Sequence, residues 1–411
     1  MRKTSKRCIP RRTDSGMLSL QPKSFDSSAA TLLLALHVLA LSWFALNHPI
    51  YTWDVVPYVA TTFAAETEDP AAVHEATYGL LRQSLDAAQF NALISGEYAA
   101  AMYSSPENFA TQLSMYEIKP LYVLVLGGLA AVGVNPVQGI IWLSLIPGLL
   151  ICVILFLWLR NLTGPMQAAL VVILFSICAR LFDLSRIPTP DNLSALMVLA
   201  GVYLLLARGW VAAAVICLGL SIWVRSNNIL FVAPLLALLC WNHWRRGEPL
   251  RSADLYWYSG GLSFGVFSYF SISAVYDYDW WRLFYHTLVQ PIVDIEEFSI
   301  HFSWNKYLQI LSNAALDLVT LDQVLQWLSS NALLFLLLWV MTANWDILAR
   351  ILCPKQQVSI SEAALLCMLV IMATILLFPL ISGLDRLLCA SYAIITVSAV
   401  DPHSDPLGTE S

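Results

Sequence analysis

The segment with the clearest capacity for chemistry is Ile50–Tyr58, which follows the first long apolar run and carries Asp54 between Trp53 and Tyr58. A carboxylate just beyond a membrane helix lies where lipid head groups meet water, a level that Trp and Tyr favour. Such a carboxylate can accept the proton of an attacking hydroxyl as a general base. The alternative is structural, with Asp54 capping an interfacial helix inside an ordinary aromatic belt.

Three cations stand next to the ends of apolar runs, where fixed positive charge can bind an anionic group. They are Lys119, Arg225 and Arg386. Fixed positive charge at a membrane interface can hold the phosphate of a lipid carrier and stabilise it as a leaving group. Each cation has a structural alternative: Lys119 as a snorkelling anchor, Arg225 as a paired charge in a short turn, and Arg386 as the local ion-pair partner of Asp385.

The composition determines what kind of protein must position these groups. Of 411 residues, 58% are hydrophobic and 12% are charged, and the mean hydropathy is +0.67. This exceeds what a soluble core of that length could bury. The apolar runs are continuous stretches of about twenty residues rather than short alternating segments, which favours helices over barrel strands. We therefore predict an all-α, polytopic helical membrane protein with about 10–11 transmembrane segments.

The predicted chain has a basic tail, one membrane domain and a short C-terminal tail. Seven Lys and Arg residues precede the first apolar run, which begins near residue 29, and they predict a cytoplasmic N-terminus. Residues 1–28 form the tail, 29–400 the transmembrane domain, and 401–411 a second cytoplasmic tail. Long outer loops are expected at about 48–118 and 276–330. The predicted location is the cytoplasmic membrane.

The first outer loop is expected to hold structure of its own. Its apolar residues recur at helical spacing, so we predict two or three amphipathic helices at the interface. Asp69-Pro70 and Ser105-Pro106 predict the breaks between them.

If every apolar segment crossed the membrane once, the basic hinge at residues 244–254 would lie on the outer side, against the preference of basic residues for the cytoplasm. One of the segments before the hinge therefore cannot be a simple crossing. We assign the exception to 164–190, where Arg180, Asp183 and Arg186 interrupt the run, and we predict a re-entrant or half-spanning helix there. The three charges are expected to pair with one another. The apolar segment 120–134 is predicted to be a full span. On this map Asp191 and Arg225 face the same side as Asp54.

The order of these motifs resembles the GT-C class of membrane glycosyltransferases, within it the branch of protein mannosyltransferases and aminoarabinose transferases. The likeness covers about residues 30–400. Lys119-Pro120-Leu121 is similar to the branch's Lys-Pro-Pro-Leu motif with one Pro missing, and Asp54 matches the Asp early in the first outer loop. The Thr189-to-Leu193 step, the Arg225-to-Asn228 turn and the Asp385-to-Leu388 segment also look like that class.

The resemblance implies transfer of a sugar from a polyprenyl-phosphate carrier, on the outer face of the membrane, to an acceptor that no motif identifies. It implies a catalytic role for Asp54. The residues expected to bind substrate are Tyr58, Glu117, Lys119, Asp191, Arg225 and Arg386.

The sequence lacks the motifs that are typical of several other classes of protein. The sequence has no CxxC, HExxH, Walker-type or GxGxxG motif, which disfavours an ATP-driven pump, and we expect no nucleic-acid partner. Eight cysteines avoid both long outer loops, so no disulfide framework is implied. A divalent cation would take oxygen ligands from Asp54, Glu117 or Asp191, with His286 and His301 as further candidates, although no spacing defines a metal site.

Two other functions stay open from the residues alone. A secondary transporter would also have interrupted helices, at Pro147-Gly148 and at residues 180–190, but the sequence shows no two-fold repeat and its charges gather near one interface. A non-catalytic scaffold of envelope polysaccharide assembly is the second alternative.

Overall fold

The computed structural model describes residues 23–247, 249, 251–277, 279–317, 360–379 and 384–400. Most of the predicted basic tail, the part of the second predicted outer loop beyond residue 317 and the tail at 401–411 lie outside the described residues.

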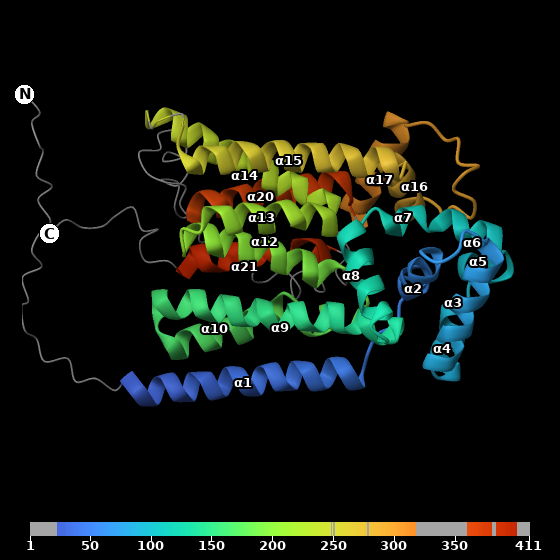
Figure 1. The fold of residues 1–411 in the computed structure, drawn as a ribbon, viewed down its shortest axis with the longest axis horizontal. Coiled ribbons are helices and arrows are strands. Elements are labelled where there is room, and N and C mark those ends of the chain that lie inside the picture. Colours follow the sequence, from blue (N-terminus) through green and yellow to red (C-terminus); the bar gives the residue numbers. More distant parts are fainter. Residues whose placement is uncertain are drawn as a thin grey trace, which may run out of the picture.

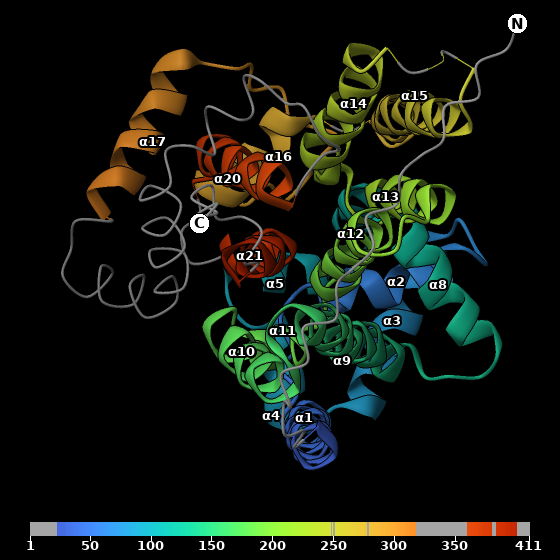
Figure 2. The same cartoon turned by 90° about the vertical axis from the view of Figure 1, so that its left-hand side faces the viewer.

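A bundle of roughly parallel helices forms the body of the molecule (Figures 1 and 2). Its members are α1 (Lys23–Asn47), α9 (Pro136–Thr163), α10 (Pro165–Cys178), α12 (Asp191–Leu206), α13 (Val211–Val224), α14 (Ile229–Arg245), α15 (Ala253–Val275), α20 (Ile360–Leu377) and α21 (Leu384–Val400). We call the end where α1 begins the basic end, and the end where α1 stops, at Asn47, the site end.

The chain is an all-α, polytopic membrane protein, as the composition predicted. Within the described residues, three helices are long and apolar enough to cross a membrane, namely α1 from Asp26, α9 and α20. Shorter apolar helices, including α10, α12, α13 and most of α21, pack beside them in the same bundle.

Short helices of the first outer loop gather at the site end of the bundle (Figure 1). They are α2 (Val55–Ala64), α3 (Pro70–Ser84), α4 (Ala87–Ile94), α5 (Glu97–Ser104), α6 (Pro106–Gln112) and α7 (Ser114–Glu117). The predicted breaks are confirmed, because α3 begins at Pro70 after the N-cap Asp69, and α6 begins at Pro106 after the N-cap Ser105. Proline suits the first turn, whose N–H groups have no partner within the helix.

The assignment of 120–134 as a full span was wrong. The helix α8 (Pro120–Ala131) has 12 residues, about 18 Å at 1.5 Å per residue, against a hydrocarbon thickness of about 30 Å. It is bent by 111° from the preceding segment Pro106–Glu117. In both views α8 runs across the bundle at the site end instead of along it (Figures 1 and 2).

The expectation of a re-entrant or half-spanning segment at 164–190 was also wrong. The helix α10 starts at the basic end, and the short α11 (Leu181–Leu184) continues it after Arg180, whose backbone is left-handed with φ 51°. Beyond α11 the chain reaches the end of α1, where Arg186 Nε donates to the His48 carbonyl at 2.5 Å. The segment therefore traverses the bundle.

The charges in that segment pair with one another, as predicted. Asp183 forms ion pairs with both arginines: its Oδ2 lies 3.1 Å from Arg180 Nη2, and its Oδ1 lies 3.2 Å from Arg186 Nη1. Because α8 is the segment that does not cross, the hinge after α14 still lies at the basic end, and Asp191 and Arg225 still lie at the end of Asp54 (Figure 1).

The second outer interval returns to the site end. There α16 (Trp280–Leu288) and α17 (Trp304–Asp317) follow α15 (Figure 1). Gln112 of α6 donates through Nε2 to the carbonyls of Ile292 and Val293, at 3.2 and 2.9 Å. These bonds join the two outer intervals, which together cover the end of the bundle.

Candidate functional site

Four charged side chains from separate elements line one cavity of about 260 Å³ at the site end. Asp54 stands immediately before α2, and Lys119 immediately before α8. Arg225 follows α13, and Arg386 lies in the first turn of α21. Helix ends place all four there, although Asp54 and Arg386 are 332 positions apart in sequence.

A buried carboxylate organises two of the arginines. Asp191, the first residue of α12, is 1% exposed. Its Oδ1 pairs with Arg225 Nη1, and its Oδ2 accepts from Arg386 Nε at 2.9 Å and from Thr189 Oγ1 at 2.7 Å. A buried charge is tolerated only with such partners, so this network fixes both guanidinium groups.

Arg386 connects this network to Asp54. Its Nη2 lies 3.2 Å from Asp54 Oδ2, while Tyr116 donates its hydroxyl proton to Asp54 Oδ1 at 3.2 Å. Asp54 occupies the N-cap position of α2, yet its side chain makes no capping hydrogen bond. The capping alternative therefore does not describe this residue. A carboxylate offers about four acceptor positions, so Asp54 keeps capacity for a substrate hydroxyl.

Lys119 is held between two aromatic rings. Its Nζ lies 5.0 Å from the Tyr58 ring centroid and 4.9 Å from that of Tyr116, both cation–π distances. Burial, reinforced by the positive charge of Arg225, lowers the pKa of the Lys119 amine to about 7. The site thus holds an amine whose charge changes near neutral pH.

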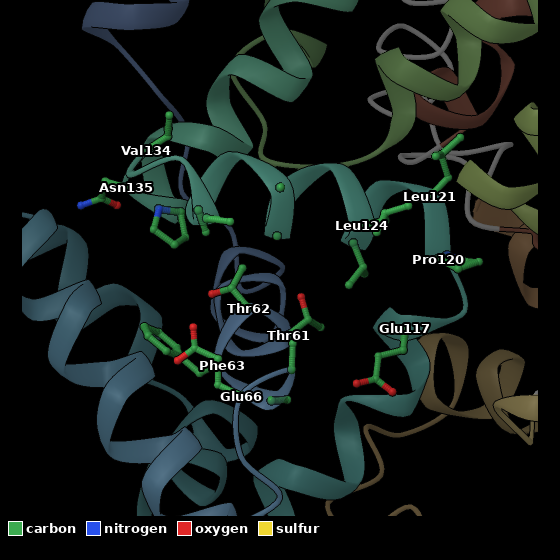
Figure 3. A pocket seen from close by; sticks show the side chains of 18 of the residues that line it. Thr61, Thr62, Phe63, Glu66, Glu117, Pro120, Leu121, Leu124, Val134 and Asn135 are labelled. Atoms are coloured by element: carbon green, nitrogen blue, oxygen red, sulfur yellow. The ribbon is translucent and has the colours of Figure 1, made fainter.

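Two of the other predicted residues lie beside the cavity rather than in its lining. Tyr58 is 1% exposed and packs beneath Lys119, and Asp191 lies behind the arginines. Glu117 faces a second, larger cavity of about 1170 Å³ between α2 and α8 (Figure 3).

The sequence reasoning did not name several residues of the site. Tyr116 contacts both Asp54 and Lys119, and its place three residues before Lys119 was the only signal. Thr189, which the sequence indicated only as the start of a motif and without a role, supports Asp191. Leu283 and Thr287 of α16 form one wall of the cavity. Nothing in the local pattern indicated that wall, because α16 reaches the site through tertiary packing.

The residues considered as metal ligands are not grouped. Among the described residues, no three His, Cys, Asp or Glu side chains lie close enough to hold a metal ion. His286 Nδ1 accepts from the Ile292 amide at 3.0 Å, and burial lowers the pKa of His286 to about 4. Both oxygens of Asp191 are already paired. These side chains do not fit a metal centre, and we derive no step through one.

Residues 119–272 match the family model of dolichyl-phosphate-mannose-protein mannosyltransferases. The match covers 154 of 411 residues, from Lys119 past Asp191 and Arg225, and does not include Asp54 or Arg386. No curated protein sequence and no solved structure matches the chain. The family match confirms the resemblance to the GT-C class and supports a membrane glycosyltransferase of that type.

Proposed function

We propose that the protein transfers a sugar from a polyprenyl-phosphate carrier to an acceptor on the outer face of the cytoplasmic membrane. The observation that carries the proposal is that Asp54 lines the same 260 Å³ cavity as Lys119, Arg225 and Arg386. A carboxylate beside three cations suits a reaction in which a hydroxyl loses its proton while a phosphate departs.

The reaction is a displacement at the anomeric carbon of the sugar. The acceptor oxygen forms a bond to that carbon, and the bond from the carbon to the phosphate oxygen breaks. The phosphate leaves with the electron pair as a lipid phosphate. The acceptor proton passes to Asp54. No other co-reactant is required, because the phosphate ester supplies the leaving group.

The charge of the network favours an anionic donor. With Lys119 protonated, three positive charges face two carboxylates, those of Asp54 and Asp191, which leaves a net charge of +1. Asp191 is too enclosed to contact substrate, so we assign it the positioning of Arg225 and Arg386. Tyr116 in turn orients the Asp54 carboxylate and packs against Lys119.

The proposed orientation follows from the basic residues. In sequence, six of them precede α1 and a seventh, Lys23, is its first residue; the hinge after α14 holds three more, at the end of the bundle where α1 begins. Basic residues favour the cytoplasmic side, which leaves the cavity at the outer face.

The transporter alternative loses one of its supports. Helix α9 continues through Pro147 from Pro136 to Thr163, so this position is not a discontinuity of the kind that transporters use. The charged groups also gather at one end of the bundle, whereas transporter sites lie near the midplane.

Extracted lipids from cells with and without the gene test the proposal. We expect mass spectrometry to show accumulation of a polyprenyl-phosphate-linked sugar when the protein is missing, because its consumer is absent. Complementation with the wild-type gene should return the lipid to its normal level, and complementation with Asp54→Asn should not. An unchanged lipid profile would favour the transporter or scaffold alternatives.

The protein should bind its donor less tightly as the pH rises through 7. A lowered pKa of about 7 means that Lys119 is mostly charged at pH 6 and mostly neutral at pH 8. The phosphodiester of the donor keeps its charge across this range. We expect the KM for the donor to rise about tenfold between these values, following the protonated fraction of the amine.

Two substitutions separate Lys119 from other groups. Lys119→Arg keeps its charge and should give a KM that hardly varies with pH. Lys119→Gln should give a KM that is equally flat but about ten- to a hundredfold higher, from the loss of about 1.5–3 kcal/mol of charge-assisted binding. If the KM of Lys119→Arg for the donor rises with pH as steeply as that of the wild type, a group other than Lys119 is responsible for the titration.

A further inference from the structure

The second cavity, of about 1170 Å³, lies between α2 and α8 at the site end and is open to the surroundings (Figure 3). Its roof is the apolar face of α8, including Leu121 and Leu124, together with the glycines Gly127 and Gly128. A cavity of this size and lining accommodates a molecule with a substantial apolar part.

The polar side chains of this cavity offer mainly hydrogen-bond acceptors, because Asn135 Nδ2 and Trp223 Nε1 already donate to Ser84 Oγ and Ser268 Oγ; the Tyr276 hydroxyl is a donor in the same lining. Thr61 and Thr62 donate their own hydroxyl protons to the backbone carbonyls of Tyr58 and Val59, so their oxygens can only accept. The carboxylates of Glu66 and Glu117 add further acceptors.

Positive charge is missing from this lining. Among the described residues that form it, none is Lys, Arg or His. Two carboxylates without a cation repel a phosphate, which is the group that the neighbouring cavity attracts. The two cavities therefore select head groups of opposite character: anionic beside Lys119, and uncharged or cationic with hydrogen-bond donors beside Glu117.

The two cavities adjoin along the break between α7 and α8. Glu117 and Pro120 line the larger one, while Ile118 and Lys119 line the smaller one. A third cavity, of about 10 Å³, shares Tyr276 with the larger cavity and Met115 with the smaller. That volume holds about one water molecule, so it marks a constriction that a shift of the flexible Met115 would widen.

We propose that the larger cavity binds the acceptor, an amphiphile with an apolar chain and a hydroxyl-bearing head group without negative charge. The inference rests on the proposed transferase function. The chain lies against α8, and the head group donates hydrogen bonds to Thr61, Thr62 and Glu117. From there one hydroxyl reaches Asp54 past the constriction.

Photochemical labelling of the purified full-length protein tests this site without requiring turnover. The probes are a dodecyl glucoside and a dodecyl phosphate, each carrying a diazirine in the alkyl chain. We expect the glucoside to label peptides within residues 120–136 in preference to the phosphate, and unlabelled dodecyl maltoside to compete. Equal labelling by the phosphate would show that the cavity takes the donor chain and would overturn the proposal.

Gly128→Phe fills the cavity without disturbing the helix, because a Cβ at this position has no heavy atom within 4 Å. We expect the labelling of α8 by the glucoside to fall at least about tenfold, the effect of occluding an apolar pocket. Gly260→Phe is the matched control. Gly260 is exposed on α15, and a Cβ added there would also meet no heavy atom within 4 Å. Labelling of α8 in Gly260→Phe should equal that in the wild type.

These variants separate the inference from the proposed function. Asp54→Asn should keep the wild-type labelling of α8 even when turnover is lost. Undiminished labelling in Gly128→Phe, measured in protein with the wild-type melting temperature, would place the probe elsewhere and overturn the acceptor site. A change in the acceptor site would leave the pH dependence at Lys119 intact.

Discussion

We expect Asp54→Asn to lower turnover by about a hundredfold or more at normal protein abundance, because a positioned general base contributes that much and Asn cannot accept a proton at neutral pH. The measurement is the initial rate of sugar transfer in membranes with matched protein levels. The effect should fall on kcat, since the donor phosphate binds to the cations and not to Asp54.

The same substitution costs little stability. Asn keeps the shape of Asp, and the side chain does not cap α2. The ion pair that it loses joins side chains that are 28% and 35% exposed, for Asp54 and Arg386, and a pair of that exposure contributes about 1 kcal/mol or less. Arg386 also keeps its bond to Asp191. A fall in activity would therefore not be explained by unfolding.

Asp69→Asn is the control for Asp54→Asn. Asp69 caps α3 by accepting from the Ala71 amide at 3.1 Å, and Asn caps about as well as Asp. It should be nearly silent in both activity and abundance. Wild-type turnover in Asp54→Asn would exclude Asp54 as the base and leave the transporter and scaffold alternatives ahead.

Local sequence signals predicted the helical class and several helix boundaries. Proline after a capping residue placed the starts of α3 and α6 correctly, because the preference of both residues for a helix start is local. The adjacency of Lys119, Arg225 and Arg386 was also suggested by sequence, since a charge at the end of an apolar run belongs at an interface.

The direction of a helix was not predictable in the same way. Residues 120–134 are as apolar as a membrane span, and hydropathy does not distinguish a helix that crosses a bundle from one that lies over its end. The bend of 111° before Pro120 decides between them, and it depends on the packing of α8 against α2 and α9. The break at Arg180 was equally hard to interpret from sequence. The chain continues in the same direction through α11 after α10 ends, so the break does not stop the crossing.

The partners within the site depend on contacts that no local pattern encodes. Asp191 meets Arg225 across 34 positions and Arg386 across 195, and Tyr116 meets Asp54 across 62. The sequence correctly predicted that Asp191 begins a helix at the same end of the bundle as Asp54. Its burial behind two arginines changes the role we assign to it, from contact with substrate to positioning of the cations.

Asp191→Asn should therefore disturb both the fold and the binding of donor. Removing one member of a buried ion-paired group costs about 3–5 kcal/mol, and we expect about 3 kcal/mol because the Arg225 and Arg386 side chains are 20% and 35% exposed. Tryptophan fluorescence in detergent should show a melting temperature lower by about 5 °C or more. In the fraction that remains folded, the KM for the donor should rise, because both guanidinium groups lose their fixed position.

Asp183→Asn is the matched control for this prediction. Asp183 also pairs with two arginines, Arg180 and Arg186, but its side chain is 33% exposed and lies outside the cavity. Ion pairs of that exposure contribute about 1 kcal/mol or less, so its melting temperature should change little and the KM for the donor should not change. Equal destabilisation by the two substitutions would mean that the enclosure of Asp191 adds nothing. A wild-type KM in Asp191→Asn would show that Arg225 and Arg386 are held in place without it.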